Sequence, residues 1–237
     1  MSATGAAYPG EVRILLVRHA QTTANAGGEL STVAPGPSLT ALGREQADAL
    51  ASVFVDEHLQ GRPLDGVYVS TLVRTTQTIE PLARLLDLPI VQLDGTHEIE
   101  AGDFEGSTDS ESMAAYLAPI RRWAQGDLGA TIPGAYDGTH FLARFDGSLA
   151  QVHATHGDDA VVVVVSHAGA MRVWLGGRTE NLDPAFSAAH RLENTGVVEL
   201  DGSPSDGWRV VRWQGEPIGG DALAEAVDSD PLGETVL

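Results

Sequence analysis

Two short apolar segments of the chain each end beside a histidine. Residues 12–17 are followed by Arg18 and His19, and residues 161–166 are followed by His167. Ligands of open α/β sheets bind at the carboxyl ends of the strands, so two histidines at such ends predict a shared site. Arg18 would give that site a fixed positive charge that suits a phosphate or a carboxylate. The structural alternative is a salt bridge at Arg18 and histidines that are held by backbone hydrogen bonds.

A neutral imidazole is a competent nucleophile toward phosphorus. Its attack on a phosphate ester gives a phosphohistidine, which water can hydrolyse in a second step. Such chemistry requires cationic donors for the phosphoryl oxygens, a hydrogen bond that fixes the tautomer of the imidazole, and a proton donor for the leaving oxygen. A histidine at a strand end therefore indicates phosphoryl chemistry when these partners accompany it.

Arg74 is a candidate for one of the cationic donors. It follows the predicted strand 65–70 and lies in the first turn of a predicted helix, 71–86. An arginine opposes the helix dipole at that end unless an anion is bound, and helix N-termini bind anions. An arginine on an exposed surface is the alternative. Beyond the second histidine, the small residues Ala168 and Gly169 would let backbone N–H groups approach a ligand closely.

Apolar segments and helical periodicities alternate along the chain. This order predicts a three-layer α/β/α sandwich with a mainly parallel central sheet. Pro81 is expected to break or kink its helix, and His153 and His156 are expected at the surface. Residues 20–38 are predicted to form a long loop. The remaining predicted strands are 88–93 and a closing hairpin, 196–200 with 208–213; the remaining predicted helices follow the N-cap Thr40 and cover 112–125, 139–156 and 170–175.

Length and composition limit the class of protein. With 237 residues and 24.9 kDa, the chain is expected to form one domain, 1–237, with a core over about 12–213 and loose tails at 1–10 and 214–237. No cysteine is present, which excludes disulfides and thiolate chemistry. The net charge of −19 argues against nucleic acid and anionic membranes as partners. No signal peptide is apparent and the apolar runs are too short to cross a bilayer, so a cytoplasmic protein is expected.

Jointly, these segments resemble the histidine phosphatase superfamily, which is also called phosphoglycerate-mutase-like. The resemblance covers about residues 12–200, with the motifs in the family's order, and it makes residues 106–139 the variable insert that caps the substrate. The matching residues are Arg18, His19, Thr22 and Asn25; Leu39, Thr40, Gly43, Gln46 and Ala47; Ser70, Leu72, Arg74, Gln77 and Thr78; Glu98 ahead of the segment 102–106; and Ser166, His167 and Gly169.

The resemblance implies a phosphoglycerate-mutase-like fold and a phosphomonoester hydrolase of the histidine acid phosphatase-like kind. It makes His19 the acceptor of the phosphoryl group. Arg18, Arg74 and His167 would bind the phosphoryl oxygens, and Glu98 would protonate the leaving group and then activate water.

Further expectations concern the substrate and cofactors. Asn25 and Ala168 would contact the substrate, a small phosphorylated molecule from which inorganic phosphate is released. Arginines supply the positive charge, and no residue spacing indicates a metal site, so neither a metal nor another cofactor is expected. Either Glu100 or Glu105 would replace Glu98 in the pocket if the register of the loop differs.

The chain departs from the family pattern at two places. Ala20 and Ala168 stand where the family has glycine, and a positive φ at either position would cost alanine about 1 kcal/mol. Residues 26–38 contain no arginine, lysine or glutamine, whereas the mutases carry an arginine and a glutamine there to bind a second anion. Their absence favours a phosphatase. A mutase-type phosphoryl transfer and a phosphate-binding regulatory domain of low activity are the alternatives.

Overall fold

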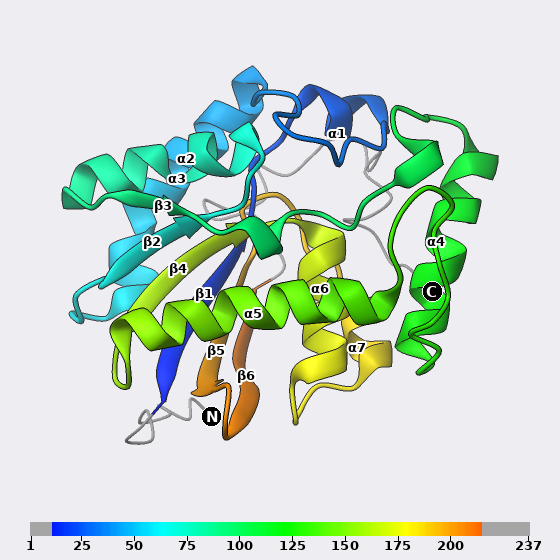
Figure 1. Cartoon of the computed structure of the whole chain (residues 1–237). Helices are drawn as coiled ribbons and strands as arrows, with labels where there is room; N and C mark the ends of the chain where they lie inside the picture. The colour runs from blue at the N-terminus through cyan, green and yellow to red at the C-terminus, as the bar shows by residue number, and fades with distance from the viewer. Residues whose placement is uncertain (1–10, 215–237) are drawn as a thin grey trace.

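The computed structural model describes residues 11–214 of the chain (Figure 1). The strands are β1 (Val12–Arg18), β2 (Gly66–Val69), β3 (Ile90–Gln92), β4 (Val161–Ser166), β5 (Val197–Ser203) and β6 (Gly207–Gln214). They form one sheet in the order β3–β2–β4–β1–β5–β6. The first four strands of the chain run parallel, β5 runs antiparallel to β1, and β6 runs antiparallel to β5. The mainly parallel sheet that the sequence predicts is confirmed.

Helices cover both faces of the sheet, which confirms the predicted sandwich. They are α1 (Thr23–Gly27), α2 (Ala41–Phe54), α3 (Val73–Leu86), α4 (Ser110–Ala124), α5 (Gly138–His156), α6 (Ala168–Arg178) and α7 (Pro184–Ala189). Leu15 and Val17 of β1 pack in one apolar cluster with α2 and α3, whereas Ile14 and Leu16 pack in a second cluster with α4, α5 and α6. Figure 1 shows α5 lying across this second face. Strands covered on both faces become apolar throughout, as β1 and β4 are.

The register of the two central strands determines where the histidines lie. β1 pairs with β4 so that Arg18 is opposite Ser166. The next residue of each strand is a histidine, and the backbone N–H of His19 donates to the carbonyl of Ser166 at 3.0 Å. His19 and His167 therefore leave neighbouring strands side by side, at the carboxyl edge of the parallel sheet.

One local prediction is wrong, and a second is wrong as far as a break at Pro81 is concerned. The predicted loop 20–38 contains the short helix α1, which Thr22 and Asn25 stabilise by a capping box at its N-terminus. Pro81 does not end α3, which continues through it to Leu86. Proline removes one backbone hydrogen bond of a helix, and here the apolar face that α3 buries beside Pro81, including Ile79, offsets that loss.

The C-terminal turn of α5 carries the two histidines that were expected at the surface. Both are partly buried. His156 forms a hydrogen bond through Nε2 with the hydroxyl of Tyr68 at 2.6 Å, and His153 pairs with Asp158 at 3.3 Å. The expectation of simple surface residues is wrong because the helix end turns toward the start of β2.

The predicted insert, 106–139, contains α4 and joins the main core. Tyr116 of α4 donates its hydroxyl hydrogen to the carbonyl of Ile99 at 2.9 Å, and the insert's role as a cap stays a prediction. The predicted tails lie outside the described residues, except for Gln214, which ends β6. Within residues 11–214, no helix has the length and hydropathy that crossing a membrane requires.

Candidate active site

His19 lies in a buried position directly after β1, with 4% of its surface exposed. Its ring Nδ1 is 2.8 Å from the carbonyl oxygen of Ala20. A carbonyl only accepts hydrogen bonds, so Nδ1 carries the hydrogen and Nε2 carries the lone pair. Burial lowers the pKa of His19 well below its usual value, and the positive charges of Arg74 and Arg18 lower it further. The ring is therefore a neutral imidazole with a nucleophilic Nε2.

His167 is fully buried after β4, with its ring centroid 5.0 Å from that of His19. Arg74 donates to its Nδ1 from Nε at 3.2 Å and from Nη2 at 3.0 Å. A guanidinium cannot accept, so the ring hydrogen of His167 is on Nε2, which donates to the hydroxyl of Ser70 at 2.7 Å. Burial, followed by the charge of Arg74, lowers the pKa of His167 well below its usual value.

Two buried guanidinium groups surround the histidines. Arg74 lies in the first turn of α3, as predicted, and also donates from Nη2 to the carbonyl of Ser31 at 3.1 Å. Arg18 donates from Nη1 to the carbonyl of Leu192 at 2.7 Å. Both lie close enough to His19 to depress its pKa. Buried positive charge of this kind favours an anion beside it.

Glu98 is a buried carboxyl group that lines the same pocket as His19 and Arg74. Its Oε1 accepts hydrogen bonds from the backbone N–H groups of Ile99 at 2.8 Å and Ala170 at 2.7 Å, and its Oε2 accepts from Gly169 at 3.1 Å. The last two donors belong to the N-terminus of α6, where the helix dipole favours a carboxylate. Burial nevertheless raises the pKa of Glu98, because desolvation outweighs these hydrogen bonds and the charge of Arg74.

The other two candidate carboxylates are engaged elsewhere. Glu100 lies 2.8 Å from Nε2 of His97 and 3.5 Å from Nη2 of Arg144. Burial alone would raise the pKa of Glu100, but His97 and Arg144 together lower it to about 2. Glu105 accepts hydrogen bonds from the backbone and hydroxyl of Thr32. Neither lines the pocket beside His19, whereas Glu98 does.

A small cavity of about 30 Å³ joins these groups to α1 and the loop after it. Asn25 lines it, and the side-chain oxygen of Asn25 accepts hydrogen bonds from the backbone and hydroxyl of Thr22, both at 2.9 Å. Its chemistry toward a ligand would therefore be that of a donor. The motifs did not identify three further polar residues of the lining, Glu29, Ser31 and Thr32, because the loop that carries them has no periodic pattern.

Alanine is unstrained at both positions where the family has glycine. Within residues 11–214, the non-glycine residues with positive φ are Gln60, Asp87, Asp159 and Thr195. Ala20 and Ala168 are therefore in ordinary backbone regions, and the expected cost does not arise. The glycine that the site requires is Gly169, where a Cβ would lie 2.8 Å from Oε1 of Glu98.

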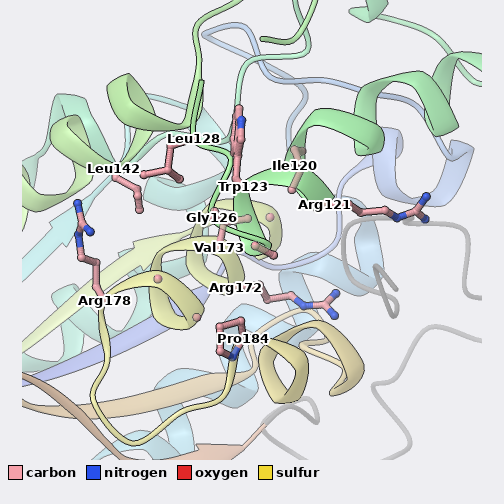
Figure 2. A pocket seen from close by; sticks show the side chains of 14 residues that line it. Ile120, Arg121, Trp123, Gly126, Leu128, Leu142, Arg172, Val173, Arg178 and Pro184 are labelled. Atoms are coloured by element: carbon pink, nitrogen blue, oxygen red, sulfur yellow. The ribbon is translucent and has the colours of Figure 1, made fainter. Parts of the chain in front are cut away.

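A larger cavity, of about 250 Å³, lies between α4, α6 and the start of α7 (Figure 2). Its wall is mainly apolar, with Arg121 and Arg178 on opposite sides. None of its lining residues is a histidine, aspartate or glutamate. Histidine and glutamate line the smaller, polar pocket instead. No cluster of three or more metal-binding side chains occurs within residues 11–214, and the absence of a cofactor stays a prediction.

Comparison with known proteins identifies relatives along most of the chain. A PE-PGRS family protein of Mycobacterium tuberculosis is 34% identical over 90% of this chain, which spans 38% of that protein's length. Phosphoserine phosphatase 1 of Hydrogenobacter thermophilus is 32% identical, over 68% of this chain and 73% of its own. Glucosyl-3-phosphoglycerate phosphatase of Mycolicibacterium vanbaalenii is 30% identical, over 85% of this chain and 92% of its own.

Solved structures show the same fold. The native mycobacterial glucosyl-3-phosphoglycerate phosphatase superposes with a TM-score of 0.70 at 24% identity, over 87% of this chain and 100% of that one. The same phosphatase in complex with VO3 superposes with a TM-score of 0.69 at 25% identity, over 86% of this chain and 99% of the other. The model of the histidine phosphatase superfamily, branch 1, matches residues 14–215. The chain therefore belongs to the histidine phosphatase superfamily, and phosphatases are among its relatives.

Proposed function

We propose that the chain is a metal-independent phosphomonoesterase of the histidine acid phosphatase-like kind, which works through a phosphohistidine on His19. The observation that carries this proposal is the state of His19. Its ring is neutral, its Nδ1–H donates to the carbonyl of Ala20, and the residue lines a pocket together with Arg74 and Glu98. The phosphatases among the relatives act on small phosphorylated molecules, which supports a substrate of that class.

In the first step, Nε2 of His19 attacks phosphorus as the bond to the leaving oxygen breaks. Glu98, in its acid form, gives that oxygen its proton. Arg18 and Arg74 neutralise the phosphoryl oxygens, and Asn25 donates at the rim. For His167 to bind the phosphoryl group as well, the guanidinium of Arg74 must turn from Nδ1 of His167 to the phosphoryl oxygens. Nδ1 then takes a proton from solvent, which the dianion favours, and donates to a phosphoryl oxygen.

In the second step, water hydrolyses the phosphohistidine. The Glu98 carboxylate takes a proton from the water as its oxygen attacks phosphorus. The bond between phosphorus and Nε2 breaks, and the products are inorganic phosphate and the neutral imidazole. Glu98 regains its proton in this step, and the backbone N–H group of Ala168, at the start of α6, would contact the phosphate.

The proposed roles of His19 and Glu98 predict a bell-shaped dependence of activity on pH. The reaction needs neutral His19, whose lowered pKa means that activity rises with pH only in the acidic range. It also needs protonated Glu98, whose raised pKa keeps the acid form present at a higher pH than an ordinary glutamate, and activity falls as pH rises through that pKa. The lowered pKa of His19 and the raised pKa of Glu98 therefore widen, at both ends, the pH range in which the neutral imidazole and the carboxylic acid coexist.

The direct test is phosphate release from p-nitrophenyl phosphate in excess EDTA. The wild-type chain is expected to turn over at mildly acidic pH, and rapid quenching is expected to capture a phosphoenzyme that is stable to base and labile to acid. A requirement for added metal would contradict the proposal, as would no release across a panel of phosphate esters. Transfer of the phosphoryl group within one molecule, without release of phosphate, would assign the mutase class instead.

Replacing Gly169 with alanine tests whether Glu98 must hold its observed position. The new Cβ would lie 2.8 Å from Oε1 of Glu98, which is too close for a van der Waals contact, so the carboxylate would have to move. A displacement of this size is expected to lower kcat by about 10- to 100-fold. Gly177→Ala is the matched control, because Gly177 also belongs to α6. The Cβ of this variant would lie 3.7 Å from Leu142, which is an ordinary van der Waals contact. Equal activity of the two variants, measured at equal thermal stability, would contradict the role of Glu98.

A further inference from the structure

Glu29 is an acidic residue that lines the pocket of His19, Arg74 and Glu98. Its side chain is exposed, and the structure gives it no hydrogen bond or ion pair within residues 11–214. The hydrolytic mechanism assigns it no task. A carboxylate that faces a phosphate-binding pocket opposes binding of anions, so its position calls for a function of its own.

The backbone around Glu29 is held on both sides. Its N–H donates to the carbonyl of Ala24 in α1 at 2.9 Å. The next residue, Leu30, donates to the carbonyl of Ser107 at 2.9 Å and accepts from the N–H of Gly106 at 2.7 Å. The carboxylate is thus carried by a fixed segment at the rim, which makes it able to select among ligands.

Two other polar groups of this rim are already engaged within the protein. The carbonyl of Ser31 accepts a hydrogen bond from Arg74. The hydroxyl of Thr32 donates to Glu105 at 2.6 Å and accepts from the N–H of Ala101 at 2.9 Å. Residues 26–38 contain no arginine or lysine. The pocket is therefore positive at its phosphate end, where Arg74 lies, and negative at its rim.

The charge of the whole chain acts in the same direction. At a formal charge of −19, the chain repels phosphate esters at long range. An ammonium group on the leaving group makes the net charge of the ester less negative by one and reduces this repulsion, whereas a carboxylate makes the net charge more negative by one. The negative charge of Glu29 and the net negative charge of the chain thus both favour esters whose leaving group carries an ammonium group.

We propose that Glu29 is a specificity-determining residue that selects phosphomonoesters whose leaving group carries an ammonium group, and rejects those with a second anion. This inference rests on the proposed phosphatase activity. With the phosphoryl group at His19 and Arg74, the leaving group extends toward α1 and the loop after it, where Glu29 accepts a hydrogen bond from the ammonium.

Three esters of similar size test the selection: O-phosphoethanolamine, n-propyl phosphate and 2-phosphoglycolate, whose leaving groups are cationic, neutral and anionic. The wild-type chain is expected to prefer the first over the second in kcat/KM by about three- to fivefold, the value of an accessible ion pair. It is expected to disfavour the third by a similar factor. Equal kcat/KM for all three would overturn the selection while leaving the phosphatase activity established.

The variants separate the local charge from the global one. Glu29→Gln is expected to remove the preference for the cationic ester, and Glu29→Arg to reverse it in favour of 2-phosphoglycolate. Glu45→Gln, at an exposed position of α2 outside the pocket lining, removes the same charge and should retain the wild-type preference. A preference that survives in Glu29→Gln would overturn the inference. Absence of phosphate release from any ester in the wild type would instead overturn the phosphatase activity, and this inference with it.

Discussion

Replacement of His19 by alanine is expected to lower kcat for p-nitrophenyl phosphate by at least about 10⁴-fold, the scale on which loss of a nucleophile acts. The phosphohistidine cannot form without Nε2, so the acid-labile phosphoenzyme should also disappear. The fold should persist, because the ring donates its hydrogen bond to the carbonyl of the adjacent residue, Ala20. Unfolding temperature and far-ultraviolet circular dichroism check that the loss is chemical.

His156→Ala serves as the matched control. This histidine contacts Tyr68 of β2 and lies next to Gly66, at the start of that strand and therefore at the opposite edge of the sheet from His19. Its removal should change kcat by less than about twofold, because His156 does not line the pocket that contains His19. A His19→Ala protein that is folded and retains more than about 1% of wild-type kcat would contradict the nucleophilic role, which predicts a far larger loss.

Glu98→Gln is expected to lower kcat/KM by about 10²- to 10⁴-fold for an ester that needs a proton to depart. n-Propyl phosphate is such an ester, because an alkoxide is a poor leaving group. p-Nitrophenyl phosphate departs as a stable anion and should lose much less. kcat/KM is the appropriate measure because it reports the step that forms the phosphoenzyme, before water is needed.

The pH profile gives a second readout for Glu98. Because its pKa is raised by burial, wild-type kcat/KM should fall as pH rises through that value. This limb should be absent in Glu98→Gln and present in Glu100→Gln, since Glu100 lies outside the pocket and pairs with His97 and Arg144. Equal losses for both esters, with the limb retained, would assign Glu98 a structural role only.

The sequence predicts those parts of the site that regular secondary structure positions. His19 and His167 follow apolar segments, and parallel strands end at one edge of a sheet, so their proximity follows from the pattern alone. Arg74 is likewise placed by the start of α3. The fold class is predictable for the same reason, because alternation of strands and helices leaves few arrangements of layers.

The residues on irregular segments could not be assigned in this way. Among Glu98, Glu100 and Glu105, the sequence offers no periodicity to decide which carboxyl group faces the pocket. Glu98 is held by the N–H groups at the start of α6. Glu100 is bound by Arg144 and His97, and Glu105 is bound by Thr32. Each of these partners is distant in the chain or depends on tertiary packing.

The pairing of Arg18 with Ser166 in neighbouring strands has an evolutionary consequence. The two imidazoles owe their separation to the spacing between strands, which is nearly constant in all sheets. Loops at the rim, such as the one that carries Glu29, can accept insertions and substitutions without moving either ring. Selection can therefore diversify what such a protein recognises while its reactive pair is inherited unchanged.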